Sequence, residues 1–119
     1  MNPHGIVSYA GTCSDCGDGI PRESVQRLRF TDLVFLVDPT ATVVEFAFLD
    51  VDDSRPIATW TAGSYLAIVP ETGAWRATAQ TPQIGVGGLD LAVGYWRVFG
   101  RFTLGGDVVV LELETIRIT

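Results

Sequence analysis

The last thirty residues alternate apolar and polar side chains with a period of two, and this pattern constrains the fold more than any other feature. The alternation runs through Val93–Leu104 and resumes in Val108–Ile118, with Gly105-Gly106-Asp107 between them. A period of two is typical of a strand with one buried and one solvent-facing side. Two such strands joined by a glycine-rich pair of residues predict a β-hairpin. Within the first strand, one parity carries Trp96, Val98, Phe102 and Leu104, and the other carries Tyr95, Arg97, Phe99 and Arg101.

Two irregularities interrupt this hairpin. Gly100 stands among the large apolar residues of the first strand, which predicts a bulge or a close approach by another part of the chain. In the second strand the apolar parity changes between Leu113 and Ile116. Because a slip of one residue exchanges the two faces of a strand, we expect a bulge near Glu114-Thr115.

The remainder of the chain after residue 24 has the same character. It is rich in Val, Ile, Thr and aromatic residues, which favour strands, and no long stretch keeps a helical apolar stripe, so we expect almost no helix. Ala62-Gly63-Ser64 is interpreted as a hairpin turn, and Thr81–Asp90 as a glycine-rich loop. The further expected strands are Val25–Phe30, Leu33–Val37, Thr42–Leu49, Ile57–Thr61, Tyr65–Val69 and Ala74–Ala79. Short strands at this spacing predict an all-β chain folded as an antiparallel β-sandwich over residues 25–119.

Residues 1–24 differ from this pattern. They contain both cysteines and the only histidine, together with several glycines, and they show no periodicity. We therefore expect an irregular N-terminal arm outside the sandwich. Its clustered apolar side chains are Ile6, Val7 and Tyr9, and we expect these residues to bind a partner subunit.

Cys13-Ser-Asp-Cys16 is the one motif with possible chemistry. Two thiolates at this spacing form half of a tetrahedral metal site, with His4 available as a third ligand. The same pair is compatible with free thiols or with a local disulfide. All three interpretations stay open from the sequence, and the incomplete ligand set leads us to expect no cofactor.

Composition restricts the possible partners. The 119 residues, enough for one domain, carry a net charge of −6, and all eight cationic side chains are arginines. Without a cationic cluster, neither nucleic acid nor an anionic membrane surface is an expected partner. No apolar run approaches the roughly 18 residues of a membrane span, and the first sixteen residues lack the pattern of a secretory signal peptide.

Catalysis is not expected either. The lone His4 lies in the irregular arm, so no Ser–His–Asp arrangement is credible, and no pair of carboxylates stands out. The acidic group Asp50, Asp52 and Asp53 is interpreted as a solvated turn, with calcium binding as the alternative. The tryptophans Trp60, Trp75 and Trp96 are expected in the core, with a sugar-binding platform as the alternative.

Three segments in order carry a family resemblance. Gly73-Ala-Trp75-Arg-Ala is similar to a Gly-x-Trp-x-Ala strand, Leu91-Ala-Val-Gly94-Tyr95 to a Leu-x-x-Gly-x-Tyr corner, and Phe102-Thr-Leu-Gly-Gly-Asp107 to a closing hairpin. With the strands before them, they make Leu28–Ile118 resemble the immunoglobulin-like domains of tailed-phage virion proteins, in particular the N-terminal domain of upper-baseplate proteins. Here Tyr95 follows the glycine directly, and the cysteine-containing arm is not part of the pattern.

The resemblance implies an immunoglobulin-like sandwich that mediates assembly and carries no catalytic residues. We therefore expect a non-enzymatic structural component of a bacteriophage particle, which docks on capsid or tail. Its partners would be other virion proteins, with homo-oligomers possible, and it would be assembled in the host cytoplasm and located in the virion. The alternative is a carbohydrate-binding or adhesion module that uses exposed aromatic residues.

Overall fold

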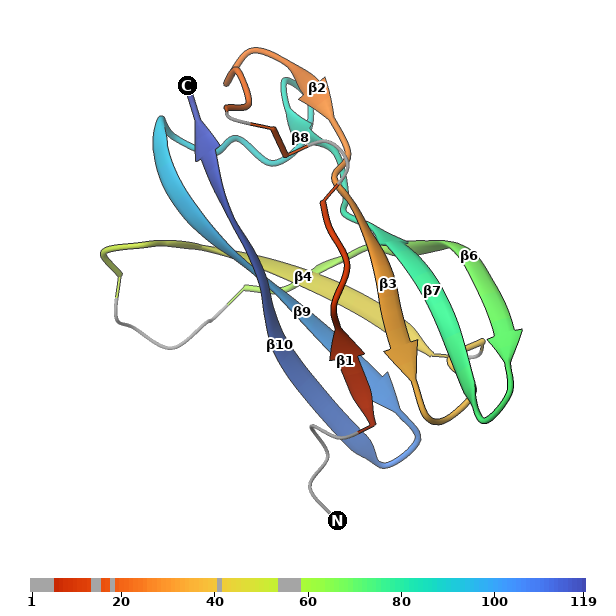
Figure 1. Ribbon diagram of the computed structural model, residues 1–119. Coiled ribbons are helices and arrows are strands. Elements are labelled where there is room, and N and C mark those ends of the chain that lie inside the picture. Colours follow the sequence, from red (N-terminus) through yellow and green to blue (C-terminus); the bar gives the residue numbers. More distant parts are fainter. Residues whose placement is uncertain (1–5, 14–15, 18, 41, 54–58) are drawn as a thin grey trace.

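Strands account for all the regular structure in the described part of the chain (Figure 1). The computed structural model describes residues 6–13, 16–17, 19–40, 42–53 and 59–119. Over these ranges it contains no helix, and so none that is long and apolar enough to cross a membrane. The strands are β1 (Val7–Tyr9), β2 (Val25–Gln26), β3 (Arg29–Phe35), β4 (Val43–Asp50), β5 (Thr61–Ala62), β6 (Ser64–Glu71), β7 (Ala74–Gln80), β8 (Ile84–Gly85), β9 (Gly94–Leu104) and β10 (Asp107–Ile118).

Two antiparallel four-stranded sheets form the sandwich. The first sheet has the strand order β1-β3-β7-β6, and the second has the order β10-β9-β4-β5. Strands β2 and β8 form a small separate pair at one end. When the sandwich strands are lettered in chain order, β1, β3, β7 and β6 become A, B, E and D, and β10, β9, β4 and β5 become G, F, C and C′. These are the two sheets of an immunoglobulin sandwich. The predicted fold class, an all-β immunoglobulin-like antiparallel sandwich, is therefore confirmed.

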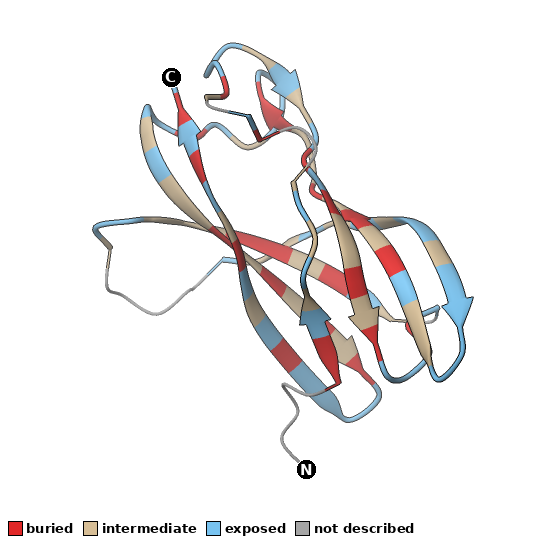
Figure 2. Cartoon of the chain, in the orientation of Figure 1, coloured by how far each residue is buried: buried red, intermediate tan, exposed pale blue. Residues whose placement is uncertain are grey.

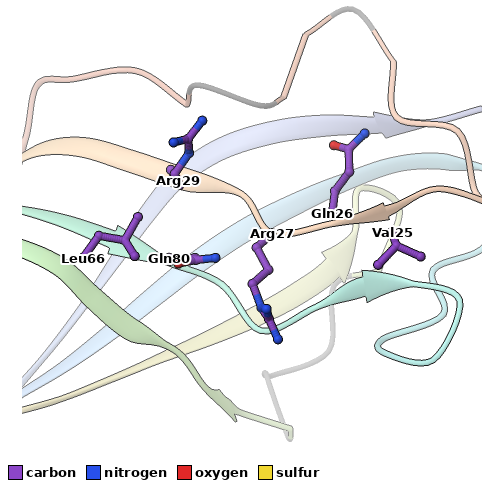
Figure 3. A pocket seen from close by; sticks show the side chains of 6 residues that line it. All are labelled: Val25, Gln26, Arg27, Arg29, Leu66 and Gln80. Atoms are coloured by element: carbon purple, nitrogen blue, oxygen red, sulfur yellow. The ribbon is translucent and has the colours of Figure 1, made fainter.

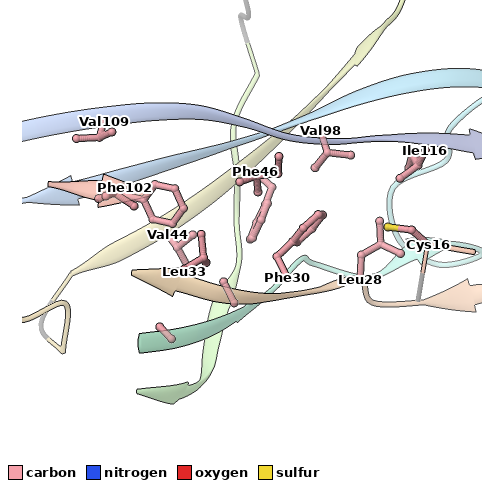
Figure 4. Close-up of a cluster of buried hydrophobic side chains, with 14 of the residues drawn as sticks. Cys16, Leu28, Phe30, Leu33, Val44, Phe46, Val98, Phe102, Val109 and Ile116 are labelled. Atoms are coloured by element: carbon pink, nitrogen blue, oxygen red, sulfur yellow. The ribbon is translucent and has the colours of Figure 1, made fainter. Parts of the chain in front are cut away.

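The core lies between the inner faces of the two sheets (Figures 2 and 4). Phe30 on β3 stacks against Phe46 on β4, with ring centroids 5.8 Å apart. Phe35, also on β3, meets the Phe102 ring of β9 edge-on at 5.6 Å. All four rings are fully buried. Burial of each ring contributes about 1.5–3 kcal/mol, so these two contacts across the sheets are a principal reason that the layers stay together.

The β9–β10 hairpin follows its predicted register. Inward and outward residues of β9 alternate as expected, and Gly105-Gly106 forms the turn between Leu104 and Asp107. The predicted change of parity is a bulge at Leu113, because Glu112 faces Phe99 and Glu114 faces Val98. At Gly100 the expected close approach is present: a Cβ there would lie 3.0 Å from the Phe102 ring.

The predicted hairpin at Gly63 is wrong. Strand β5 pairs with β4 in the second sheet, whereas β6 pairs with β7 in the first, so the chain changes sheets at this glycine. The Gly63 amide donates to the Val44 carbonyl at 2.9 Å, which brings the crossing segment against the second sheet. A Cβ at Gly63 would overlap the Phe46 ring and the Gln80 carbonyl. This position therefore requires glycine for lack of space.

The prediction of an irregular arm is also corrected in its described residues. Residues 7–9 form β1 and pair with β3, and Cys13 makes a further antiparallel bridge to Phe30. Ile20 then makes a parallel bridge to Ile118 on β10. In its described residues, the arm thus contacts the edges of both sheets. A strand of three residues is too short to show periodicity, which is why the sequence did not reveal it.

Smaller differences concern the expected strand limits. The two stretches predicted around residues 25–37 are joined in β3 across a bulge, where Asp32 adopts a φ of 56°. The predicted glycine-rich loop 81–90 contains β8. The strand predicted at Ile57–Thr61 lies partly outside the described residues.

Candidate interaction surfaces

The cysteine motif forms a disulfide. Cys13 and Cys16 are bonded to each other with Cα atoms 5.5 Å apart, and Cys16 is buried in the core cluster. Sulfur atoms in a disulfide are not the thiolates that a metal needs, so the predicted metal site at these cysteines is not present. His4, its predicted third ligand, lies outside the described residues. Within the described ranges, no group of three or more potential ligand residues is placed to hold a metal ion.

The predicted partner-binding residues of the arm face the chain's own core. Ile6 and Val7 are buried there, with Val7 only 1% exposed. The Tyr9 ring is half-buried and meets Phe30 edge-on at 6.0 Å, while its hydroxyl donates to Glu114 Oε1 at 3.3 Å. Burial, together with the neighbouring Glu114 carboxylate, raises the pKa of Tyr9 above its ordinary value. The structure therefore replaces the expected contact with another subunit by packing within the sandwich.

The outer face of the second sheet carries aromatic rings paired with arginines. The Arg101 guanidinium lies over the Trp60 ring, 4.6 Å from its centroid, and also bonds the Glu45 carboxylate at 2.9 Å. Cation–π contacts of this kind contribute about 0.5–1 kcal/mol at exposed sites. Trp60 is thus attached to the sheet through an arginine that an ion pair already orients.

The same arrangement recurs along β9. Arg97 lies over the Phe99 ring at 5.0 Å and bonds Glu112 at 2.6 Å. Near the start of β9, the Tyr95 ring has the guanidinium of Arg117, from β10, 5.8 Å from its centroid. Stacking of a sugar needs an open aromatic face, and on each of these rings one face is occupied by a guanidinium. This arrangement weakens the case for a carbohydrate platform on this sheet.

The other two tryptophans are only half-buried, although the sequence predicted core positions. Both Trp75 and Trp96 pack against the core cluster with part of the ring exposed. Trp96 Nε1 donates to the Ala92 carbonyl at 2.8 Å. This bond runs from the start of β9, strand F of the sandwich, to the backbone a few residues upstream, as the hydroxyl does in a tyrosine corner. Trp96 stands where the Leu-x-x-Gly-x-Tyr pattern places its tyrosine, so it replaces the corner hydroxyl with an indole N–H.

A groove opens beside the start of β3 (Figure 3). Its volume is about 510 Å³, and its lining brings together two arginines, two glutamines and two apolar side chains. The side chain of Gln26, at the end of β2, and that of Arg27, which follows it, point in opposite directions (Figure 3). The lining residues are Val25, Gln26, Arg27, Arg29, Leu66 and Gln80. Guanidinium and amide groups bind carboxylates and other anions, but they supply neither a nucleophile nor a base at neutral pH.

A bidentate ion pair attaches the arm to the loop before β9. Arg22 Nε and Nη2 donate to the two carboxylate oxygens of Asp90 at 3.0 and 3.1 Å. These hydrogen bonds hold the pKa of Asp90 below its ordinary value. The pair joins residues 68 positions apart, and no local pattern in the sequence indicates it.

The acidic turn after β4 is organised by its own backbone. The Asp50 carboxylate accepts a hydrogen bond from the Asp52 amide at 2.9 Å, and the Asp53 amide donates to the Asp50 carbonyl. This is the hydrogen bonding of a solvated turn, as the sequence predicted.

Comparison of the chain with protein-family models, with curated proteins and with solved structures finds no match.

Proposed function

We propose that this protein is a non-enzymatic structural component of a bacteriophage particle, which docks on capsid or tail through the surface of its sandwich. The observation that carries the proposal is the placement of the three segments behind the family resemblance. Gly73–Ala77 contains the end of the β6–β7 turn and the start of β7, Leu91–Tyr95 leads into β9, and Phe102–Asp107 contains the end of β9 and the β9–β10 turn. All three segments belong to strands of the sandwich or to the turns between them, and Trp96 donates to the Ala92 carbonyl at the corner before β9, which supports the proposal.

Fold alone does not imply function, so the surfaces must also agree with an assembly role. The described surface offers exposed apolar strand residues and arginine–aromatic pairs, which are suited to contacts with other proteins. The lining of the groove at β3 includes the exposed Arg27 side chain, whose guanidinium is suited to an acidic segment of a partner.

A mass-spectrometric inventory of purified particles tests this proposal. Bacteriophage particles are purified by density gradient from cells that produce both the particles and this chain. The intensities of peptides from the chain are then compared with those of peptides from the major capsid protein. We expect the chain at a fixed ratio to the capsid protein across gradient fractions. If it stays in the soluble lysate, or is found in particle fractions without a constant ratio, the proposal is wrong.

The carbohydrate-binding alternative depends on the Trp60 ring, which is half-exposed on the outer face of the second sheet. A glycan screen with the wild-type chain and with Trp60→Ala distinguishes the two functions. Binding that disappears in the variant would favour adhesion, whereas we expect no glycan to bind, because Arg101 covers one face of the ring.

A further inference from the structure

Over the first half of β10, the outward backbone groups bond no other described residue. At its C-terminal end the edge is covered: the Ile20 amide donates to the Arg117 carbonyl at 2.8 Å, and the Thr119 amide donates to the Ile20 carbonyl at 2.9 Å. Along residues 108–112, strand β10 pairs only with β9 among the described residues. Unpaired backbone groups in such a row are a template for pairing with another chain.

The register shows which backbone groups point outward from this edge. Arg117 and Thr119 bond the arm, so their main-chain groups face away from β9. Two residues earlier the alternation reaches Thr115, and the extra residue at the Leu113 bulge then shifts it by one position. The outward groups in the first half are therefore those of Val108, Val110 and Glu112. The tight turn agrees, because Leu104 and Asp107 flank a two-residue loop and so exchange hydrogen bonds with each other.

The side chains of this open segment are apolar and exposed. Val108 is 55% exposed and Val110 is 38% exposed, and both lie on the outer face of the second sheet. Residues 108–111 are all apolar and mostly β-branched, a composition that favours strand pairing. The first sheet ends instead in β6, which is interrupted by a bulge at Leu66 and carries Pro70 near its end. Both long edges carry a bulge, but β6 also carries a proline, which lacks the N–H that pairing needs, so residues 107–112 of β10 are the longer uninterrupted run.

We propose that β10 pairs with β10 of a second copy of this chain, antiparallel and with a two-fold axis at Val110. The second sheets of the two copies then become one continuous sheet. In this register Val110 faces its own counterpart, Val108 faces Glu112, and Val109 faces Leu111 of the other copy. The three outward residues of each copy exchange about six main-chain hydrogen bonds across the axis. Such an interface uses the same patch on both copies and closes on itself, so it gives a dimer and not a filament.

The charges are compatible with this register. Glu112 is the one ionised side chain among residues 108–112, and it already bonds Arg97 at 2.6 Å. Pairing at Val110 places it opposite Val108 and avoids the Glu112–Glu112 contact that a register centred two residues later would create. Each copy nevertheless carries a net charge of −6, so the copies repel one another over a distance. Salt screens this repulsion, and we therefore expect the dimer to tighten as ionic strength rises from about 0.01 M to about 0.15 M.

Sedimentation equilibrium of the full chain tests the proposal, with concentration varied up to about 1 mM. We expect a mass that rises from 12.8 kDa toward twice that value. Val110→Lys places like charges at the axis and should weaken dimerisation at least about tenfold. Val43→Lys is the matched control, because Val43 is 54% exposed on the same outer face but lies on the inner strand β4. Circular dichroism of both variants verifies that the monomer remains folded.

Hydrogen exchange supplies the second measurement. Amides in a peptide covering residues 107–113 should gain protection above the dissociation constant, while those of β6 should not. A chain that stays monomeric at 1 mM overturns the proposal. Dimerisation that survives Val110→Lys, or that is lost in Val69→Lys on β6, also overturns it. The inference concerns the free chain, so its failure would leave the particle inventory unaffected.

Discussion

Replacement of Val7 by alanine distinguishes packing of the arm within the sandwich from docking on a partner. Val7 is 1% exposed and belongs to the core cluster, although it lies in the segment predicted from the sequence to be an irregular arm. The substitution removes two methyl groups, which corresponds to about 1.6 kcal/mol of transfer free energy. Incomplete collapse of the resulting cavity adds to this loss. We expect the free energy of unfolding to fall by about 2–3 kcal/mol.

Urea denaturation followed by circular dichroism measures this change. The matched control is Val25→Ala, because Val25 lies in the small β2–β8 pair and is 59% exposed. We expect that control to change the free energy of unfolding by less than about 0.5 kcal/mol. If Val7→Ala is as mild as the control, β1 does not pack in the core in solution. Residues 6–9 would then be available to a partner subunit, and the corrected account of the arm would be refuted.

Four further outcomes follow from the structure. Gly63→Ala should cost about 1–3 kcal/mol in urea denaturation, because its Cβ meets Phe46 and a backbone carbonyl, whereas Gly106→Ala, which has open space around it, should be nearly neutral. Replacing both cysteines with serine should lower the free energy of unfolding by about 2 kcal/mol, the loop-entropy value for so short a loop, and a mass measurement should detect the disulfide in the parent chain. Trp96→Phe removes the corner hydrogen bond and should cost about 1 kcal/mol in the same assay, with Trp96→Tyr recovering part of the loss. Thermal stability should decline as pH rises above about 10, because the folded state raises the pKa of Tyr9 and holds a proton that the unfolded chain releases; Tyr9→Phe should reduce that decline.

The sequence predicted those parts of the fold that depend on local periodicity. Eleven residues of β9 and twelve of β10 are long enough to display which side chains face inward, and even the bulge at Leu113 left a change of parity. The alternation likewise predicted that Arg97, Phe99 and Arg101 share the face of β9 opposite to the apolar one. Their stacking partner Trp60 was not, because it comes from a segment about forty residues earlier and its position depends on the tertiary fold.

The errors share one physical cause, which is that short segments pair according to the tertiary fold. Gly63 has the flanking residues of a hairpin turn, yet the neighbouring strands belong to different sheets. Three residues of β1 give no periodic signal, although Val7 is buried as completely as residues of the long strands. The disulfide was one of three interpretations of Cys13 and Cys16, because spacing alone does not determine whether two thiols bond each other or a metal.

The course of the arm accounts for both the closed and the open parts of the sandwich edge. It pairs with β3 through Val7–Tyr9 and then reaches β10 at Ile20, so it passes from the edge of the first sheet to the edge of the second (Figure 1). Arg22 fixes it there through the bidentate pair with Asp90. The arm's backbone bonds β10 only near Ile118, so among the described residues the outward backbone groups at Val110 have no hydrogen-bond partner, although Tyr9 contacts Glu114 further along the strand. The same segment that completes the core therefore also determines where a second strand has room to add.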